Sequence, residues 1–183
     1  RRQRQMCIRD SYYSGIGVEE DGAQAVLWFQ KAAEQEYPRA IQLLGECYDR
    51  GVGVEQNLEK AAQLYQQAHE LGYISATCSL GLCYELGSGV EPDKEKAVQL
   101  YRLAALAGDA RAQCNLGFCY YHGIGVEEDN DKALYWFRKA AEQGSARAQF
   151  LVGECYEFAY GTEKDLTKAA EYYAMADEQD YPS

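Results

Sequence analysis

Residues 112–126 read AQCNLGFCYYHGIGV, and residues 132–140 read KALYWFRKA. The same order of alanine, glycine, tyrosine and lysine returns along the chain at a spacing of 36 residues. Internal repetition with a period of roughly 20–50 residues is typical of solenoids and other repeat arrays. The repeat unit is therefore the feature from which the fold of this sequence has to be predicted.

Five copies of the unit align in phase, and several columns hold the same kind of residue. The tyrosine column is Tyr12, Tyr48, Tyr84, Tyr120 and Tyr156. The turn segments are 15–18 (GIGV), 51–54 (GVGV), 87–90 (GSGV), 123–126 (GIGV) and the degenerate 159–162 (AYGT). The alanine columns are Ala25, Ala61, Ala97, Ala133 and Ala169, and Ala32, Ala68, Ala104, Ala140 and Ala176. The aromatic column is Phe29, Tyr65, Tyr101, Phe137 and Tyr173.

Each copy predicts two helices separated by the glycine turn. In the second copy, residues 39–50 carry an apolar stripe at helical spacing, and the paired glycines of 51–54 then break the helix. A second helix is expected over 58–71, with Asn57 as its N-cap and Gly72 at its end. The later second helices have their expected caps at Asp93, at Asp129 or Asn130, and at Asp165.

Glycine recurs inside the first helix of four copies. An interior glycine costs a helix about 1 kcal/mol relative to alanine, so the recurrence predicts a close approach in which a Cβ would clash. We expect the alanine columns to face these glycines, which are Gly45, Gly81, Gly117 and Gly153. The first copy has Arg9 at this position, which predicts a truncated or frayed end of the array.

The combined pattern resembles the Sel1-like repeat, a relative of the tetratricopeptide repeat. It is read in the fourth copy from Ala112, Leu116, Gly117, Tyr120, Gly123, Gly125, Val126, Lys132, Ala133, Phe137 and Ala140. The resemblance implies an all-α fold, a right-handed α-solenoid of five 36-residue helix-turn-helix units forming a single domain. The units are expected at about 1–37, 38–73, 74–109, 110–145 and 146–183. Residues 180–183 match the columns of 36–39, so we expect a piece of a longer array or multidomain protein.

The charge balance argues against nucleic acid and anionic membranes as partners. The formal net charge is −11, and the only cluster of basic residues is Arg1, Arg2 and Arg4 at the terminus. Binding to phosphate backbones depends on clustered lysine and arginine side chains that displace counterions. No run of 18 apolar residues is present to insert into a membrane.

The cysteines are predicted to be buried thiols that pack as small hydrophobes. Cys47, Cys83, Cys119 and Cys155 share one column, Cys78 and Cys114 share a second, and Cys7 lies one position from it. No Cys-x-x-Cys pair is present, so we expect no metal. Some cysteine-rich bacterial members of the family carry disulfide pairs within a repeat. This sequence lacks that pattern, which favours a reducing compartment such as the cytoplasm.

The sequence predicts neither a catalytic site nor a cofactor. Cys114 and His122 are about two helical turns apart, too far for a nucleophile–base pair. His69 is interpreted as a tolerated surface substitution for alanine. The Gly-x-Gly-Val turn lacks the Lys-Ser/Thr of a phosphate-binding loop, and the paired carboxylates lie at solvated helix starts. We therefore predict that the chain is not an enzyme.

The resemblance implies that first-helix residues line the concave side and bind a partner. In copies three to five, apolar residues gather on this concave side and are rimmed by arginine and by Glu85 and Glu157. The alternative is that Phe118 and Phe150 belong to the core. The predicted site is Leu82, Leu86, Arg111, Cys114, Asn115, Phe118, Tyr121, His122, Arg147, Phe150, Glu154 and Phe158. Related repeats clamp a terminal carboxylate, but here only Asn115 and Arg147 match that clamp, so we do not predict it.

These residues predict a protein–protein interaction scaffold or adaptor that binds a peptide or protein segment on its concave face. The alternative is a regulatory or targeting module of a larger multidomain enzyme or signalling protein. A partner protein or peptide is expected under both hypotheses, with no nucleic acid and no insertion into a membrane.

Overall fold

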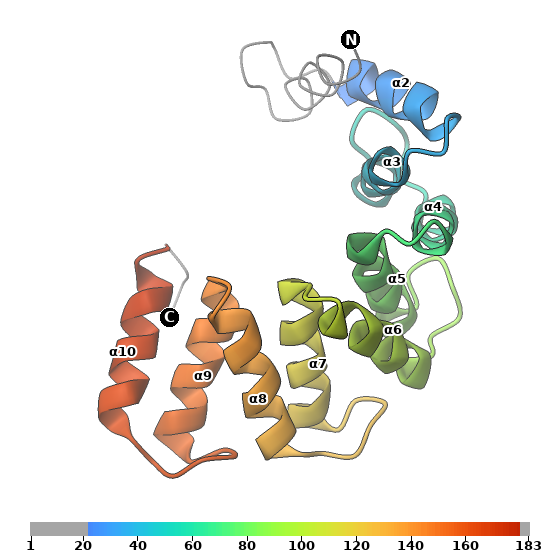
Figure 1. Ribbon diagram of the computed structural model, residues 1–183. Coiled ribbons are helices and arrows are strands. Elements are labelled where there is room, and N and C mark those ends of the chain that lie inside the picture. Colours follow the sequence, from blue (N-terminus) through green and yellow to red (C-terminus); the bar gives the residue numbers. More distant parts are fainter. Residues whose placement is uncertain (1–21, 180–183) are drawn as a thin grey trace. The chain divides into compact units, whose positions relative to one another are not determined.

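The computed structural model describes residues 22–179, and within this range the chain is helical and has no strand (Figure 1). The helices are α2 (Gly22–Ala33), α3 (Pro38–Arg50), α4 (Leu58–Glu70), α5 (Ile74–Leu86), α6 (Lys94–Leu106), α7 (Ala110–His122), α8 (Asn130–Ala141), α9 (Ala146–Phe158) and α10 (Leu166–Asp177). The all-α prediction is therefore confirmed. The expectations for Arg9, Cys7, the terminal arginines and residues 180–183 lie outside the described residues.

The chain divides into two compact units, Arg1–Pro92 and Asp93–Ser183. In the first unit α2 packs on α3, α3 on α4, and α4 on α5. In the second unit the same succession runs from α6 to α10, and Figure 1 shows α7, α8, α9 and α10 side by side. Packing between consecutive helices is the arrangement of a repeat protein, in which each element contacts its neighbours. That both units belong to one continuous solenoid stays a prediction.

The second helices of the second to fifth repeats, α4, α6, α8 and α10, each begin at a side-chain cap. The side-chain oxygens of Asn57, Asp93 and Asp129 each accept a hydrogen bond at 2.9 Å from the backbone N–H three residues later. Asp165 accepts the equivalent bond at 3.0 Å. These caps were predicted, and Asn130 is the first residue of α8 rather than its cap. Such caps satisfy an N–H that the helix itself leaves without a partner.

The two glycines of the turns at 51–54, 87–90 and 123–126 have different roles. The first ends the first helix in the left-handed conformation, as Gly123 does with φ of 65°. The second also has a positive φ, and in addition a Cβ on it would overlap the first residue of the preceding second helix. For Gly125 the overlapping atom is the carbonyl oxygen of Lys94, and for Gly161 it is that of Asn130. The degenerate fifth turn keeps Gly161 but has Ala159 at the first position, with φ of 62°.

The Ala159→Gly variant is expected to raise the free energy of unfolding by about 1 kcal/mol, because glycine adopts the left-handed conformation without the penalty that a Cβ brings. Urea denaturation followed by circular dichroism measures this change. As a control, Ala170→Gly in the exposed interior of α10 should lower the free energy by about the same amount. A destabilised Ala159→Gly variant would contradict this account of the turn.

The helix-interior glycines face the alanine columns, as expected, but they pack most closely against aromatic rings, which the sequence did not predict. A Cβ on Gly117 would lie 2.6 Å from the Cδ1 atom of Phe137, and one on Gly153 would lie 2.6 Å from Cε1 of Tyr173. The alanine column contributes its backbone: the carbonyl oxygen of Ala133 would be 3.1 Å from the Cβ on Gly117. Each aromatic side chain therefore occupies the space that the missing Cβ leaves.

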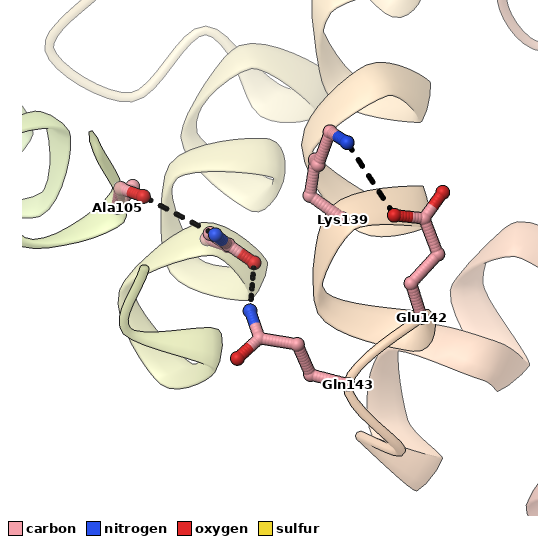
Figure 2. A network of polar contacts seen from close by, with 5 residues as sticks. Ala105, Lys139, Glu142 and Gln143 are labelled. Carbon is pink, nitrogen blue, oxygen red and sulfur yellow. Dashed lines mark hydrogen bonds and ion pairs between the residues drawn. The ribbon is translucent and has the colours of Figure 1, made fainter. Parts of the chain in front are cut away.

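Buried glutamines join consecutive repeats in the second unit. The Nε2 atom of Gln113 donates to the carbonyl oxygen of Ala105 at 3.2 Å, and its Oε1 accepts from Gln143 at 2.8 Å (Figure 2). Gln149 makes the equivalent contacts one repeat later. Its Nε2 donates to the carbonyl oxygen of Ala141, and its Oε1 accepts from Gln179. Satisfying both ends of a buried amide removes the cost of burying it.

The same two columns hold a different polar pair in the first unit. Thr77 is buried where α7 has Gln113, and His69 takes the place of Ala105. The Nδ1 atom of His69 lies 2.8 Å from the Thr77 hydroxyl. Thr77 is shorter than the equivalent Gln113, and His69 is longer than the equivalent Ala105, so the two side chains still meet. The interpretation of His69 as a tolerated surface substitution is therefore wrong, since it satisfies a buried hydroxyl.

Candidate partner-binding surface

The predicted site residues are divided between the two units. Leu82 and Leu86 lie on α5 in the first unit, with 37% and 65% of their surface exposed. The other ten lie on α7 and α9 in the second unit. Of these ten, Arg111, His122, Arg147 and Phe158 are exposed, and Asn115, Phe118, Tyr121, Phe150 and Glu154 are partly buried.

Cys114 does not belong to this surface. Only 3% of it is exposed, and burial raises the pKa of its thiol. Phe150 occupies the equivalent position of α9, and its ring packs 5.2 Å from that of Tyr173 on α10. This column thus points inward, toward the second helices, rather than toward a partner. Cys114 is accordingly removed from the predicted site.

A continuous path of aromatic rings crosses from α7 to the turn after α9. His122 lies 4.2 Å from Phe118 and 4.7 Å from Tyr121, measured between ring centroids. Tyr121 meets Tyr160 edge-on at 5.2 Å, and Tyr160 lies 5.9 Å from Phe158. We define the α7–α9 face as Arg111, Asn115, Phe118, Tyr121, His122, Arg147, Glu154, Glu157, Phe158 and Tyr160.

Tyr160 is a member of this face that the sequence analysis missed. It stands in the turn, where the other described copies have Val52, Ser88 and Ile124. The sequence does contain a signal for Tyr160: it is an aromatic residue in a column that otherwise holds small or aliphatic side chains. Because the site was expected on the first helices alone, the turn was not considered.

Arg147 connects α9 to α7 across the face. Its guanidinium carbon lies 5.3 Å from the centroid of the Phe118 ring, and its Nη1 donates to the Oδ1 of Asn115 at 3.5 Å. A guanidinium above an aromatic ring is attracted by the negative face of the ring. These two contacts join side chains of α9 to side chains of α7 on the face.

Two carboxylates, Glu154 and Glu157, lie on α9 and belong to the same face. Glu157 accepts a hydrogen bond from the hydroxyl of Tyr173 at 2.7 Å. Burial and the charge of Glu157 raise the pKa of Glu154. Burial also raises the pKa of Tyr121 to about 12, with further contributions from its hydrogen bond to Tyr160 and from the charge of Glu154. The charge of Glu154 thus acts on Tyr121, and the charge of Glu157 acts on Glu154.

The six described cysteines are all buried and are thiols rather than disulfides, as predicted. Burial raises the pKa of Cys47 and Cys83 to about 11 and that of Cys155 to about 12. The thiols of Cys47, Cys83 and Cys155 are therefore protonated at neutral pH, and the protonated form is a poor nucleophile and metal ligand. Within residues 22–179, no three histidine, cysteine or acidic side chains are grouped so that they would hold a metal ion.

None of the helices from α2 to α10 combines the length and the apolar character that crossing a membrane requires. This finding concerns the described part of the chain alone.

Comparison with known proteins assigns the family. The sequence model of the Sel1 repeat matches residues 3–37, 38–73, 74–109, 110–145 and 146–181. No curated protein matches the chain.

Solved structures of Sel1 repeat proteins agree with this match. A Sel1 repeat protein from Oxalobacter formigenes is 32% identical, with a TM-score of 0.87 over 98% of this chain and 71% of its own. A protective antigen of uropathogenic Escherichia coli is 33% identical, with a TM-score of 0.83 over 97% of this chain and 38% of its own. Cysteine-rich protein B of Helicobacter pylori is 32% identical, with a TM-score of 0.53 over 64% of this chain and 90% of its own.

Proteins built from these repeats generally use the fold for protein–protein interaction. Five consecutive matches cover nearly the whole sequence, and the helices of the described residues follow the same boundaries. The chain is a member of the Sel1 repeat family.

Proposed function

We propose that the chain is a protein-interaction scaffold or adaptor that binds a peptide segment of its partner on the α7–α9 face. The observation that carries the proposal is the aromatic path on this face. Phe158 at its end is 54% exposed, and Phe118, Tyr121 and Tyr160 are only partly buried. Clustered exposed aromatic side chains are typical of protein-binding surfaces, where a few such residues provide most of the binding energy.

The contacts within the face favour binding at low entropic cost. Arg147 is held on Phe118 and Asn115, and Tyr121 is held by Tyr160. Each of these side chains already has a contact within the face, so binding should restrict it less than it would restrict a side chain without one. Immobilising a flexible side chain at an interface costs about 0.5–1.5 kcal/mol, which a preorganised surface avoids.

The test begins with a peptide ligand selected on the intact chain from a library of displayed random peptides. We expect the Phe118→Ala/Phe158→Ala double variant to bind the selected peptide about 30-fold more weakly, because two truncated anchors each cost about 1 kcal/mol. Fluorescence anisotropy measures the affinity, and circular dichroism checks that the helices remain intact.

Tyr135→Ala is the matched control, since Tyr135 on α8 is 53% exposed but lies outside the α7–α9 face. It should bind as the unmodified chain does. Equal affinity of the unmodified chain and the double variant would contradict the proposed site.

A further inference from the structure

We propose that the segment bound on the α7–α9 face carries a lysine or arginine side chain, whose cation lies at Glu154 and Glu157 beside the rings of Tyr121 and Tyr160. This inference rests on the proposed function and adds the chemistry of the partner.

The two carboxylates form one negatively charged spot. Glu154 and Glu157 are three residues apart in α9, a spacing that places side chains on the same side of a helix. Tyr173 donates to the Oε2 of Glu157 and thereby fixes its position. Both residues are partly buried, so water screens their charges less than it screens those of fully exposed carboxylates. A ligand cation placed there would interact with both.

The residues that the structure describes supply no cation to this spot. Ion pairs such as Lys132–Asp129, Lys139–Glu142 and Lys168–Asp165 occur elsewhere on the second unit, and in the described part of the chain neither Glu154 nor Glu157 takes part in one. The mutual repulsion of the two carboxylates therefore has no counterion within the described structure. A partner's lysine or arginine would relieve it, whereas a partner's carboxylate would add to it.

The neighbouring rings favour the same ligand. A cation is attracted to the face of an aromatic ring by about 0.5–2 kcal/mol, depending on how far it is desolvated. On Phe118 this position is already taken by Arg147. No lysine or arginine of the described residues lies over Tyr121, Phe158 or Tyr160. Of these rings, that of Tyr121 is within reach of the charge of Glu154, which contributes to its raised pKa. The rings that hold no cation and the two carboxylates therefore favour the same kind of partner side chain, one with a cation at the end of an apolar stem.

The charges on this face favour a basic segment over an acidic or a purely apolar one. A segment with a carboxylate would have to use Arg111 and Arg147, but Arg147 is already engaged with Phe118 and Asn115. A purely apolar segment would cover Glu154 and Glu157 and desolvate them without compensation, which is costly for a charged group. The net charge of −11 further favours a basic segment during approach.

The experiment uses peptides selected from the random displayed library on the intact chain. We expect lysine or arginine to be enriched in the selected pool. One enriched peptide is then measured by isothermal titration calorimetry against the Glu154→Gln/Glu157→Gln variant, and its form with the basic residue changed to glutamine is measured against the unmodified chain. Each change should weaken binding about 10-fold or more, and the two changes together should cost little more than one.

Glu171→Gln/Glu178→Gln is the matched control, because it removes the same net charge from exposed positions on and after α10. It should keep the affinity within about 2-fold. Equal losses in both double variants would mean a non-specific attraction and would overturn the inference. A selected pool without basic residues would also overturn the inference. A peptide whose binding depends on Phe118 and Phe158 but not on the glutamates would overturn the inference and leave the proposed function standing. A peptide that is insensitive to both sets of changes overturns the proposed function as well.

Discussion

Replacing Gly125 with alanine is expected to lower the free energy of unfolding by about 3 kcal/mol, whereas the same change at Gly123 should cost only about 1 kcal/mol. Both residues have φ of 65° and stand in one turn, so the strain of placing a Cβ in the left-handed region is common to both. They differ in their surroundings. The nearest atoms to a Cβ on Gly123 are 3.6 Å away, but a Cβ on Gly125 would overlap the carbonyl oxygen of Lys94.

Equilibrium urea denaturation of the two variants measures this difference. Repeat arrays do not always unfold in one step, so hydrogen exchange of the amides of α6, α7 and α8 should accompany it. The destabilisation of Gly125→Ala is expected to centre on the start of α6, which this glycine contacts. Equal losses for both variants would show that backbone strain, rather than the contact between repeats, explains the second glycine.

The second large effect is expected at Gly117. Alanine favours a helix interior by about 1 kcal/mol over glycine, so in an uncrowded helix Gly117→Ala would stabilise. Here the new Cβ would lie 2.6 Å from Cδ1 and 2.7 Å from Cε1 of Phe137, a ring that is almost fully buried and has no room to move away. We therefore expect a net loss of about 2 kcal/mol, the opposite sign from helix propensity.

A double-mutant cycle with Phe137→Leu tests whether the ring is the cause. Leucine removes the ring edge that the Cβ would meet, so in this background most of the cost of Gly117→Ala should disappear. Thermal unfolding of the four proteins gives the coupling energy. Additive effects of the two substitutions would mean that the backbone of α8, and not the aromatic side chain, excludes the Cβ.

The repeat columns predicted the helices and caps correctly because they are local properties. Asn57 and Asp165 act as caps through bonds to backbone groups within three residues, which the sequence displays directly. The neighbours of Gly117 and Gln113 were harder to foresee. A period of 36 residues identifies equivalent positions, but it does not say whether an alanine or an aromatic ring of the next helix fills a gap. That depends on the packing of helices in three dimensions.

The candidate site was predicted in outline. Positions such as Phe118 and Phe158 came from the resemblance to inward-facing columns, and the structure places them on one surface with Tyr121. Cys114 was assigned to the surface wrongly, because a residue at the edge of a helix's buried stripe can point either into the core or toward solvent. Tyr160 was missed because a turn residue's direction is set by the left-handed residue before it, Ala159, and not by helical spacing.

The most direct test of the account maps the bound peptide on the chain by amide chemical-shift changes in NMR, which a 20.6 kDa protein permits. We expect the largest changes at α7, α9 and the turn containing Tyr160. Changes centred instead on the outer residues of α8 and α10, such as Tyr135 and Met175, would contradict it.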